Sequence, residues 1–132
     1  MIGIENSKQK GNKAIGAAIS YYTSMNYIIS IPLNDSQDYD LIVDKDNTLY
    51  KVQVKYTSQK AVNGNYKVAL RSVSGSSKQT YSTVKESSSE LLFIYTNSGH
   101  TLEIPVNEIT QVSSLTITQE IINKYSVMGE LD

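Results

Sequence analysis

Apolar residues near the N-terminus recur at steps of three and four residues, which is the spacing of one face of an α-helix. These positions are Ala14, Ala17, Ala18, Tyr21, Tyr22 and Met25, with Ile15 and Ile19 beside them. Asn6 or Ser7 is a suitable N-cap, because its side-chain oxygen can accept a hydrogen bond from the first turn, and Asn26 is a fair stop signal. The pattern therefore predicts a helix that ends at about Ser24.

After this helix the sequence changes to short apolar runs and apolar–polar alternation, which are typical of β-strands. Strands are expected at residues 27–31, 40–44, 49–57, 66–71, 91–96 and 101–104, with turn residues between them, including Asn63-Gly64-Asn65. The Ser-rich residues 72–89 predict a loop, and residues 117–125 predict a short closing helix. A helix, a run of strands and a second helix predict an α/β fold in which helices pack against one mixed sheet.

The hairpin within residues 40–57 has a register that its own apolar residues select. With residues 45–48 as a four-residue loop, side chains that alternate along each strand divide cleanly between two faces. The apolar face then carries Leu41, Val43, Tyr50 and Val52. A slip of one residue would mix polar and apolar side chains on both faces, so we expect the first register.

The other face of this hairpin gathers three polar side chains. Asp40 lies opposite Gln53 in this register, and Lys55 is diagonally adjacent. Carboxylate and amide oxygens are hard ligands that suit Mg²⁺ and a phosphate substrate, and a divalent cation lowers the pKa of a coordinated water. A lysine beside a scissile phosphate could orient that water or stabilise charge in the transition state. The alternative is that Asp40 and Lys55 form a cross-strand ion pair while Gln53 is solvated.

Length and composition narrow the class of protein. The 132 residues are enough for one domain, spanning residues 1–132, and the absence of cysteine excludes disulfides, thiol nucleophiles and cysteine-ligated zinc. We find neither a secretory leader nor an apolar run of membrane-spanning length, and therefore expect a cytoplasmic protein.

The net charge of −1 argues by itself against a strong nucleic-acid binder, but the charges are segregated along the chain. Residues 51–85 contain seven basic residues and no acidic residue. Such segregation can give one face a positive potential, and the alternative is an ordinary solvated sheet face. In the acidic C-terminal third, Glu103, Glu108 and Glu120 are expected to lie on a solvated face or at an oligomer contact.

The motif "YDLIVD…LYKVQVKYTS", preceded by "KGNKAIGAAISYYTSMNY", resembles the PD-(D/E)XK nuclease superfamily. Within it, the chain is most similar to the small branch that contains archaeal-type Holliday-junction resolvases and a bacterial group I intron homing endonuclease. The resemblance extends over most of the chain and includes "LEIPVNEI" near the end. It implies a restriction-endonuclease-like fold, with a central mixed sheet flanked by helices, and metal-dependent hydrolysis of DNA phosphodiesters.

The resemblance also implies roles for individual residues. Asp40 matches the metal-binding aspartate, Gln53 stands at the Asp/Glu position, and Lys55 matches the catalytic lysine. The backbone carbonyl of Val54 is an expected further ligand of Mg²⁺, for which Mn²⁺ is a possible substitute. Many relatives carry a glutamate on the first helix at the position of Ile15. With Gln53 uncharged and this glutamate absent, metal binding is expected to be one-metal or assisted by the DNA phosphate.

The expected partner is double-stranded or branched DNA. The side chains proposed to contact phosphates are Lys60, Lys67, Arg71, Lys78 and Lys85. Because cutting both strands needs two active sites, a homodimer or homotetramer is expected. The leading hypothesis is a site-specific homing endonuclease, and the alternatives are a Holliday-junction resolvase or an inactive DNA-binding module of the same fold.

Overall fold

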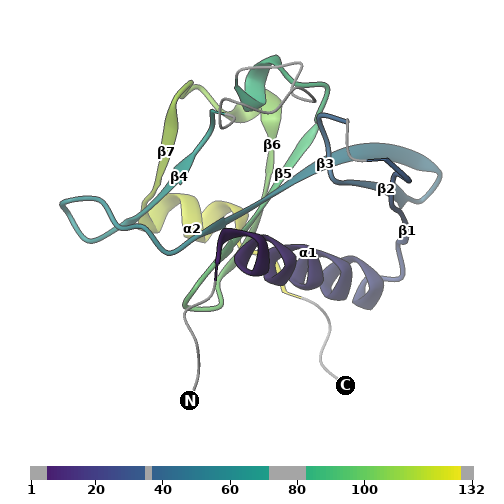
Figure 1. Cartoon of the computed structure of the whole chain (residues 1–132), viewed down its shortest axis with the longest axis horizontal. Coiled ribbons are helices and arrows are strands. Elements are labelled where there is room, and N and C mark those ends of the chain that lie inside the picture. The colour runs from purple at the N-terminus through teal and green to yellow at the C-terminus, as the bar shows by residue number, and fades with distance from the viewer. Residues whose placement is uncertain (1–5, 35–36, 72–82, 129–132) are drawn as a thin grey trace.

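The computed structural model describes residues 6–34, 37–71 and 83–128 of the chain (Figure 1). In chain order its elements are α1 (Ser7–Ser24), β1 (Ile28–Ser30), β2 (Leu41–Lys45), β3 (Thr48–Thr57), β4 (Tyr66–Ala69), a 3₁₀ turn (Val84–Glu86), β5 (Leu91–Thr96), β6 (Thr101–Pro105), a second 3₁₀ turn (Val106–Glu108), β7 (Ser114–Ile117) and α2 (Gln119–Tyr125). In the described part of the chain, neither helix is both long and apolar enough to cross a bilayer.

A five-stranded sheet in the order β1-β2-β3-β5-β6 forms the centre of the fold. The β3–β5 pair is parallel and the other three pairs are antiparallel, so the sheet is mixed. Helix α1 packs on one face of this sheet, and α2 with a separate two-stranded sheet lies on the other (Figure 1). The predicted α/β class with a central mixed sheet flanked by helices is confirmed.

Alternation along the strands divides the core between these two faces. The α1 face buries Ala18, Tyr22, Leu41, Val43, Val52, Leu91 and Phe93. The opposite face buries Val68, Leu70, Val84, Leu92, Ile94, Leu102, Ile104, Val106, Ile109, Leu115 and Ile117. The central strands are therefore covered on both sides, and a polar side chain inside them is held in a packed environment.

The predicted β2–β3 register is confirmed, since Val43 pairs with Tyr50 and Leu41 pairs with Val52. The connection is tighter than the expected four-residue loop, because Lys45 already pairs with Thr48. Asp46 and Asn47 alone make the turn, at φ of 52° and 76°. Positive φ at both central residues is the geometry of a type I′ turn, whose twist matches that of the flanking strands.

Three parts of the C-terminal half differ from the sequence-based expectation. Residues 114–117, which no strand signal had marked, form β7 and pair with β4, so β4 does not join the central sheet. Helix α2 begins at Gln119 and not at residue 117, because Ile117 belongs to β7 and Thr118 caps the helix. Within the predicted loop 72–89, residues 84–86 form a 3₁₀ turn, while residues 72–82 lie outside the described residues.

Glu103 was expected in a solvated or oligomer-forming position, and the structure contradicts this expectation. Its carboxylate accepts hydrogen bonds from the Tyr22 hydroxyl at 2.6 Å and from Lys45 Nζ at 2.8 Å. The side chains of Lys45 and Glu103 are only 21% and 13% exposed. This ion pair connects β2 and β6 beneath α1. Glu108 and Glu120 are exposed, as expected.

Candidate active site

The start of β2 places Asp40 against the middle of β3. The Asp40 backbone N–H donates to the Val52 carbonyl at 2.8 Å, and its carboxylate Oδ2 accepts from the Val54 N–H at 2.8 Å. The second bond fixes the direction of the carboxyl group. The other oxygen, Oδ1, accepts no hydrogen bond within the described part of the chain and is therefore a candidate cation ligand.

The backbone polar groups of Val54 lie on the side of β3 that faces Asp40. In a strand, the N–H and C=O of one residue point to the same side, and the Val54 N–H points to Asp40. Strand β2 begins at Leu41, so the Val54 carbonyl lies beyond the region where β2 backbone pairs with β3. A carbonyl oxygen in this position could act as a metal ligand next to the carboxylate.

Gln53 and Lys55 project from β3 on the side of the sheet that faces away from α1, as alternation from Val52 requires. Gln53 is buried, with 6% of its surface exposed, and so is not the solvated side chain of the alternative interpretation. Among the contacts of the described residues, Asp40 and Lys55 make no direct ion pair, although each charge affects the pKa of the other.

Burial shifts both ionisable groups toward their neutral forms. Burial raises the pKa of Asp40, against the opposing effects of the Val54 N–H and the Lys55 charge. Burial lowers the pKa of Lys55, and the Asp40 charge opposes this shift. Asp40 is exposed when the whole residue is considered, and only its carboxyl group is partly shielded from solvent. A bound cation would favour the ionised carboxylate, and a less basic lysine is a better proton acceptor near neutral pH.

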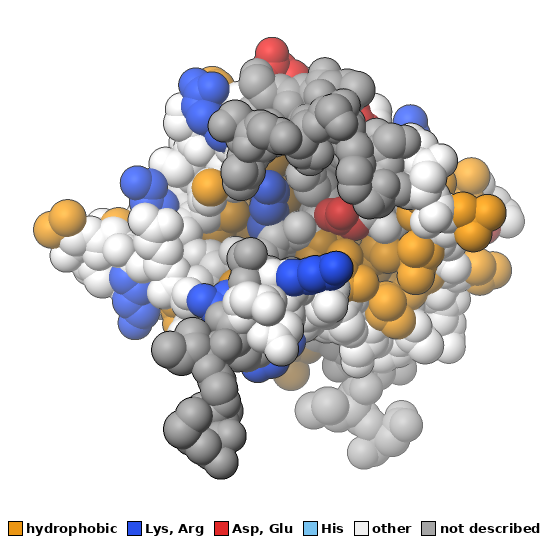
Figure 2. Space-filling view, viewed as in Figure 1, with side chains coloured by type: hydrophobic (Ala, Val, Ile, Leu, Met, Phe, Trp, Pro, Cys, Tyr) orange, Lys and Arg blue, Asp and Glu red, His pale blue; other side chains and the backbone are white. Residues whose placement is uncertain are grey.

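A groove of about 470 Å³ opens beside Lys55, between β3, β4 and the start of α1. Its described lining includes Lys10, Lys67 and Arg71 with Lys55, and no acidic residue. On this face of the molecule, Lys and Arg side chains gather over β3, β4 and the start of α1 (Figure 2). Two of the predicted phosphate-contacting residues, Lys67 and Arg71, therefore lie in one positive groove with the candidate catalytic lysine.

The remaining predicted basic contacts lie elsewhere. Lys60 is exposed and its ammonium lies over the Tyr66 ring, 5.1 Å from the centroid. Lys85 donates a hydrogen bond to the Ile109 carbonyl and lines a different hollow. Lys78 lies outside the described residues. Lys10 was not predicted as a contact, and the only signal for it is its place in the "KG" pair at the start of the helix.

A larger hollow of about 620 Å³ lies on the other side of the sheet. Its lining includes Lys45 and Glu103, which are already paired with each other. The described lining of this hollow includes none of the residues that surround Asp40. The smaller, uniformly basic groove is therefore the better candidate for binding a polyanion.

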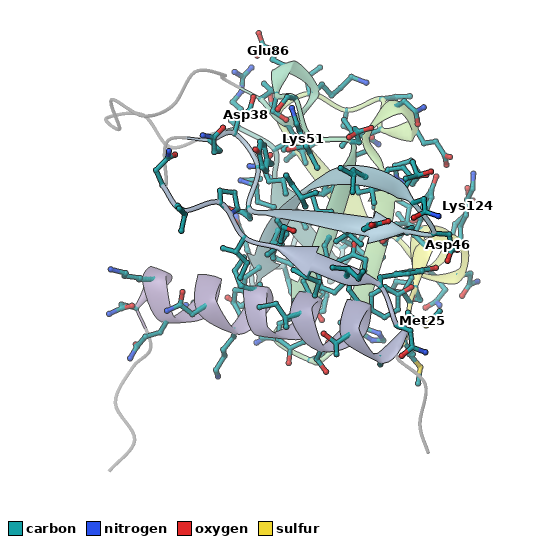
Figure 3. The ribbon with its side chains drawn as sticks, turned by 90° about the vertical axis from the view of Figure 1, so that its right-hand side faces the viewer. Met25, Asp38, Asp46, Lys51, Glu86 and Lys124 are labelled. Atoms are coloured by element: carbon teal, nitrogen blue, oxygen red, sulfur yellow. The ribbon has the colours of Figure 1, made fainter. Side chains whose placement is uncertain are left out.

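Two other acidic residues near Asp40 accept hydrogen bonds that hold local structure in place. The Asp38 carboxylate accepts hydrogen bonds from the Ser88 N–H at 2.9 Å and from the Ser88 hydroxyl, and these bonds lower the pKa of Asp38 despite its burial. Figure 3 shows Asp38 beside Lys51, at the end of the sheet near the first 3₁₀ turn. Asp44 Oδ1 accepts from the Asn47 N–H in the β2–β3 turn. Glu5 lies outside the described residues.

Ile15, at the position of the missing helix glutamate, is half-buried one turn beyond Lys10 and Gly11 in α1. Among the described residues, no group of three or more Asp, Glu or His side chains could hold a metal ion. The available donors are one carboxylate, one side-chain amide and one backbone carbonyl. All three supply hard oxygen atoms, which fit Mg²⁺ or Mn²⁺ provided that waters and a phosphate complete the coordination shell.

Comparison with known proteins agrees with this fold. A family profile described as PD-(D/E)XK endonuclease matches residues 5–127. The chain therefore belongs to the PD-(D/E)XK endonuclease family, a family of nucleases that generally use divalent metals.

Among solved structures, the chain is similar to the bacterial homing endonuclease I-Ssp6803I. The two share 28% sequence identity with a TM-score of 0.68, over 86% of this chain and 75% of that one. A search of curated protein sequences finds no match.

Proposed function

We propose that this protein is a Mg²⁺-dependent, site-specific DNA endonuclease with one active site formed by Asp40, Gln53, Val54 and Lys55. The observation that carries the proposal is the β2–β3 register, which places the Asp40 carboxylate on the Val54 N–H and next to the basic groove. Membership of the PD-(D/E)XK endonuclease family and the likeness to a homing endonuclease support it.

Each residue has a role that its surroundings favour. Asp40 Oδ1, the Gln53 amide oxygen and the Val54 carbonyl would hold Mg²⁺, with Mn²⁺ as a substitute. The cation, when bound, supplies Lewis-acid polarisation of the phosphate and acidifies a water molecule. Lys55 orients the attacking water or accepts its proton, and its charge stabilises the transition state when protonated.

Substrate binding follows from the charges of the groove. Lys10, Lys67 and Arg71 contact backbone phosphates and position the duplex with one phosphate near Asp40. Because the described residues give this site one carboxylate, the phosphate supplies part of the charge that holds the metal. Metal affinity should therefore rise when DNA is bound.

An oligomer is part of this proposal, since two sites are needed to cut two strands. On the sheet face opposite α1, one side chain from each of β1, β2 and β3 lies side by side, because Ile28 pairs with Asp44 and Asp44 pairs with Leu49. Ile28 and Leu49 are 68% and 61% exposed. These two exposed apolar side chains, one on each side of Asp44, favour a homodimer or homotetramer built from single-domain subunits, and sedimentation of wild type and Ile28→Asp would test it.

The function is tested by incubating the protein with Mg²⁺ or Mn²⁺ and a mixture of long duplex DNA and four-way junctions. We expect cleavage of a duplex at one preferred sequence. Cleavage of junctions irrespective of sequence would identify a resolvase, and metal-independent binding without cleavage would identify an inactive DNA-binding module. Cleavage that survives both Asp40→Ala and Lys55→Ala would remove these residues from the mechanism.

A further inference from the structure

The segment between β3 and β4, residues 58–65, projects from the molecule and is called here the arm. Figure 1 shows it extending beyond the rest of the fold at the left of the view. At its tip, the Gly64 N–H donates to the Ala61 carbonyl at 2.9 Å, and the Ala61 N–H donates to the Asn65 carbonyl at 2.7 Å. Gly64 has φ of +87°, which this tight turn requires and which favours glycine. The arm is therefore a hydrogen-bonded ribbon with a defined tip.

The base of the arm is fixed to the sheet that carries the proposed active site. Thr57 Oγ1 donates to the Lys67 carbonyl at 2.6 Å, and the Lys67 N–H donates to the Gln59 carbonyl at 2.9 Å. The Tyr66 hydroxyl donates to Asn97 Oδ1 at 2.7 Å, and this bond connects the arm to the β5–β6 turn. Because Thr57 lies two residues after Lys55 on β3, the position of the arm relative to the site is set by the fold.

The tip presents side chains that have no role in packing. Val62 is fully exposed, at 109% of the reference surface, and Asn63 is also exposed. A single exposed valine is too small an apolar surface for a stable protein interface, which buries about 800 Å² on each partner. Lys60 and Lys67 flank the tip, and no acidic residue occurs between residues 47 and 85. Methyl groups, an amide and flanking lysines suit DNA better than protein.

We propose that the arm enters the major groove of duplex DNA and contacts base edges with Val62 and Asn63, so that it determines the target sequence. This inference rests on the proposed endonuclease function. The major groove admits a two-stranded β-ribbon, an Asn amide can bond to adenine N6 and N7, and an apolar side chain can contact the thymine methyl. Lys60 and Lys67 would contact the phosphates on either side of the groove.

The geometry limits which base pairs the tip can reach. Val62 follows Lys55 by roughly seven residues, and at about 3.3 Å per residue this gives a maximum reach of about 23 Å. At about 3.4 Å per base pair, the contacted bases lie within about seven base pairs of the scissile phosphate. Because the arm projects from the fold in one direction, sequence preference from it should lie to one side of each cut and within about seven base pairs of it.

The test uses a library of linear duplexes with a randomised segment as the probe, selected in parallel for cleavage with Mg²⁺ and for binding in a gel shift without Mg²⁺. The arm variant is Val62→Ala with Asn63→Ser, since serine can still accept the turn bond that Asn63 Oδ1 accepts from the Asn65 N–H at 3.1 Å. The matched control is Met128→Ala with Asn123→Ser, which removes an exposed apolar group and an exposed amide that are not among the described lining of the groove. Thermal melting checks that each variant is folded.

Wild type and control should enrich one sequence, whereas the arm variant should lose discrimination by about tenfold to a hundredfold at base pairs on one side of the cut. Unchanged enrichment by the folded arm variant would overturn the inference, as would a wild type that enriches no sequence. Absence of cleavage by wild type would contradict the proposed function alone, because the binding selection still decides the role of the arm.

Discussion

Replacing Asp40 with asparagine removes the negative charge that the described residues supply to the candidate metal site, and changes little else. Asparagine Oδ1 can still accept the hydrogen bond that the Val54 N–H donates at 2.8 Å in the wild type, so the loop before β2 that contains residue 40 should keep its position. A divalent cation about 3 Å from a unit charge is stabilised by about 3 kcal/mol even at the dielectric constant of water. Asp40→Asn should therefore weaken Mg²⁺ binding, and cleavage at subsaturating Mg²⁺, by at least about a hundredfold.

The assay is cleavage of duplex DNA over a Mg²⁺ titration, together with calorimetric measurement of Mn²⁺ binding to the protein–DNA complex. Asp38→Asn is the matched control, because Asp38 lies on the same loop but its carboxylate is bonded to Ser88. This control should retain the Mg²⁺ dependence of cleavage and lose only some stability. If Asp40→Asn cleaves within about threefold of wild type at every Mg²⁺ concentration, the carboxylate is not a metal ligand and the assignment is wrong.

Four further predictions follow from the same geometry. Lys67→Ala should weaken DNA binding about equally for all sequences. In fluorescence anisotropy, the slope of the logarithm of the DNA-binding constant against the logarithm of the salt concentration should decrease in magnitude by about 1. Because burial raises the pKa of Asp40, its carboxyl is protonated at a higher pH than that of an ordinary aspartate, and Mg²⁺ binding should be lost at that higher pH when the solution is acidified. The metal-free protein should become more stable as the same carboxyl is protonated. Calorimetry of Mg²⁺ binding and urea unfolding between pH 4 and 8 would detect these two effects. Glu103→Gln leaves the half-buried Lys45 charge without its partner and should lower the free energy of unfolding by about 1–3 kcal/mol in urea titrations; a change below about 0.5 kcal/mol would contradict the structural role of this pair. Ile15→Glu should lower the Mg²⁺ concentration needed for cleavage if residue 15 faces the metal, and an unchanged titration would show that it does not.

The local features of the fold could be predicted from the sequence because they depend on neighbours in the chain. The helix from Ser7 to Ser24 follows from its apolar spacing and from Asn6, which forms a capping box with Gln9. The β2–β3 register follows from alternation, since any slip would bury polar side chains. The meeting of Asp40 with β3, and hence the candidate site, was already determined at this level.

The tertiary structure decided what depends on residues far apart in the chain. Strand β4 pairs with β7 and not with the central sheet, an interaction between residues 66–69 and 114–117 that no local pattern specifies. The half-buried pair of Lys45 and Glu103 arises because β2 and β6 present these side chains to the same space under α1. Lys10 lines the groove only because α1 packs beside β3. Periodicity determines which face a side chain occupies, but which other element covers that face depends on long-range packing. The sequence therefore predicted the residues of the candidate site, whereas the fold decided the groove beside it.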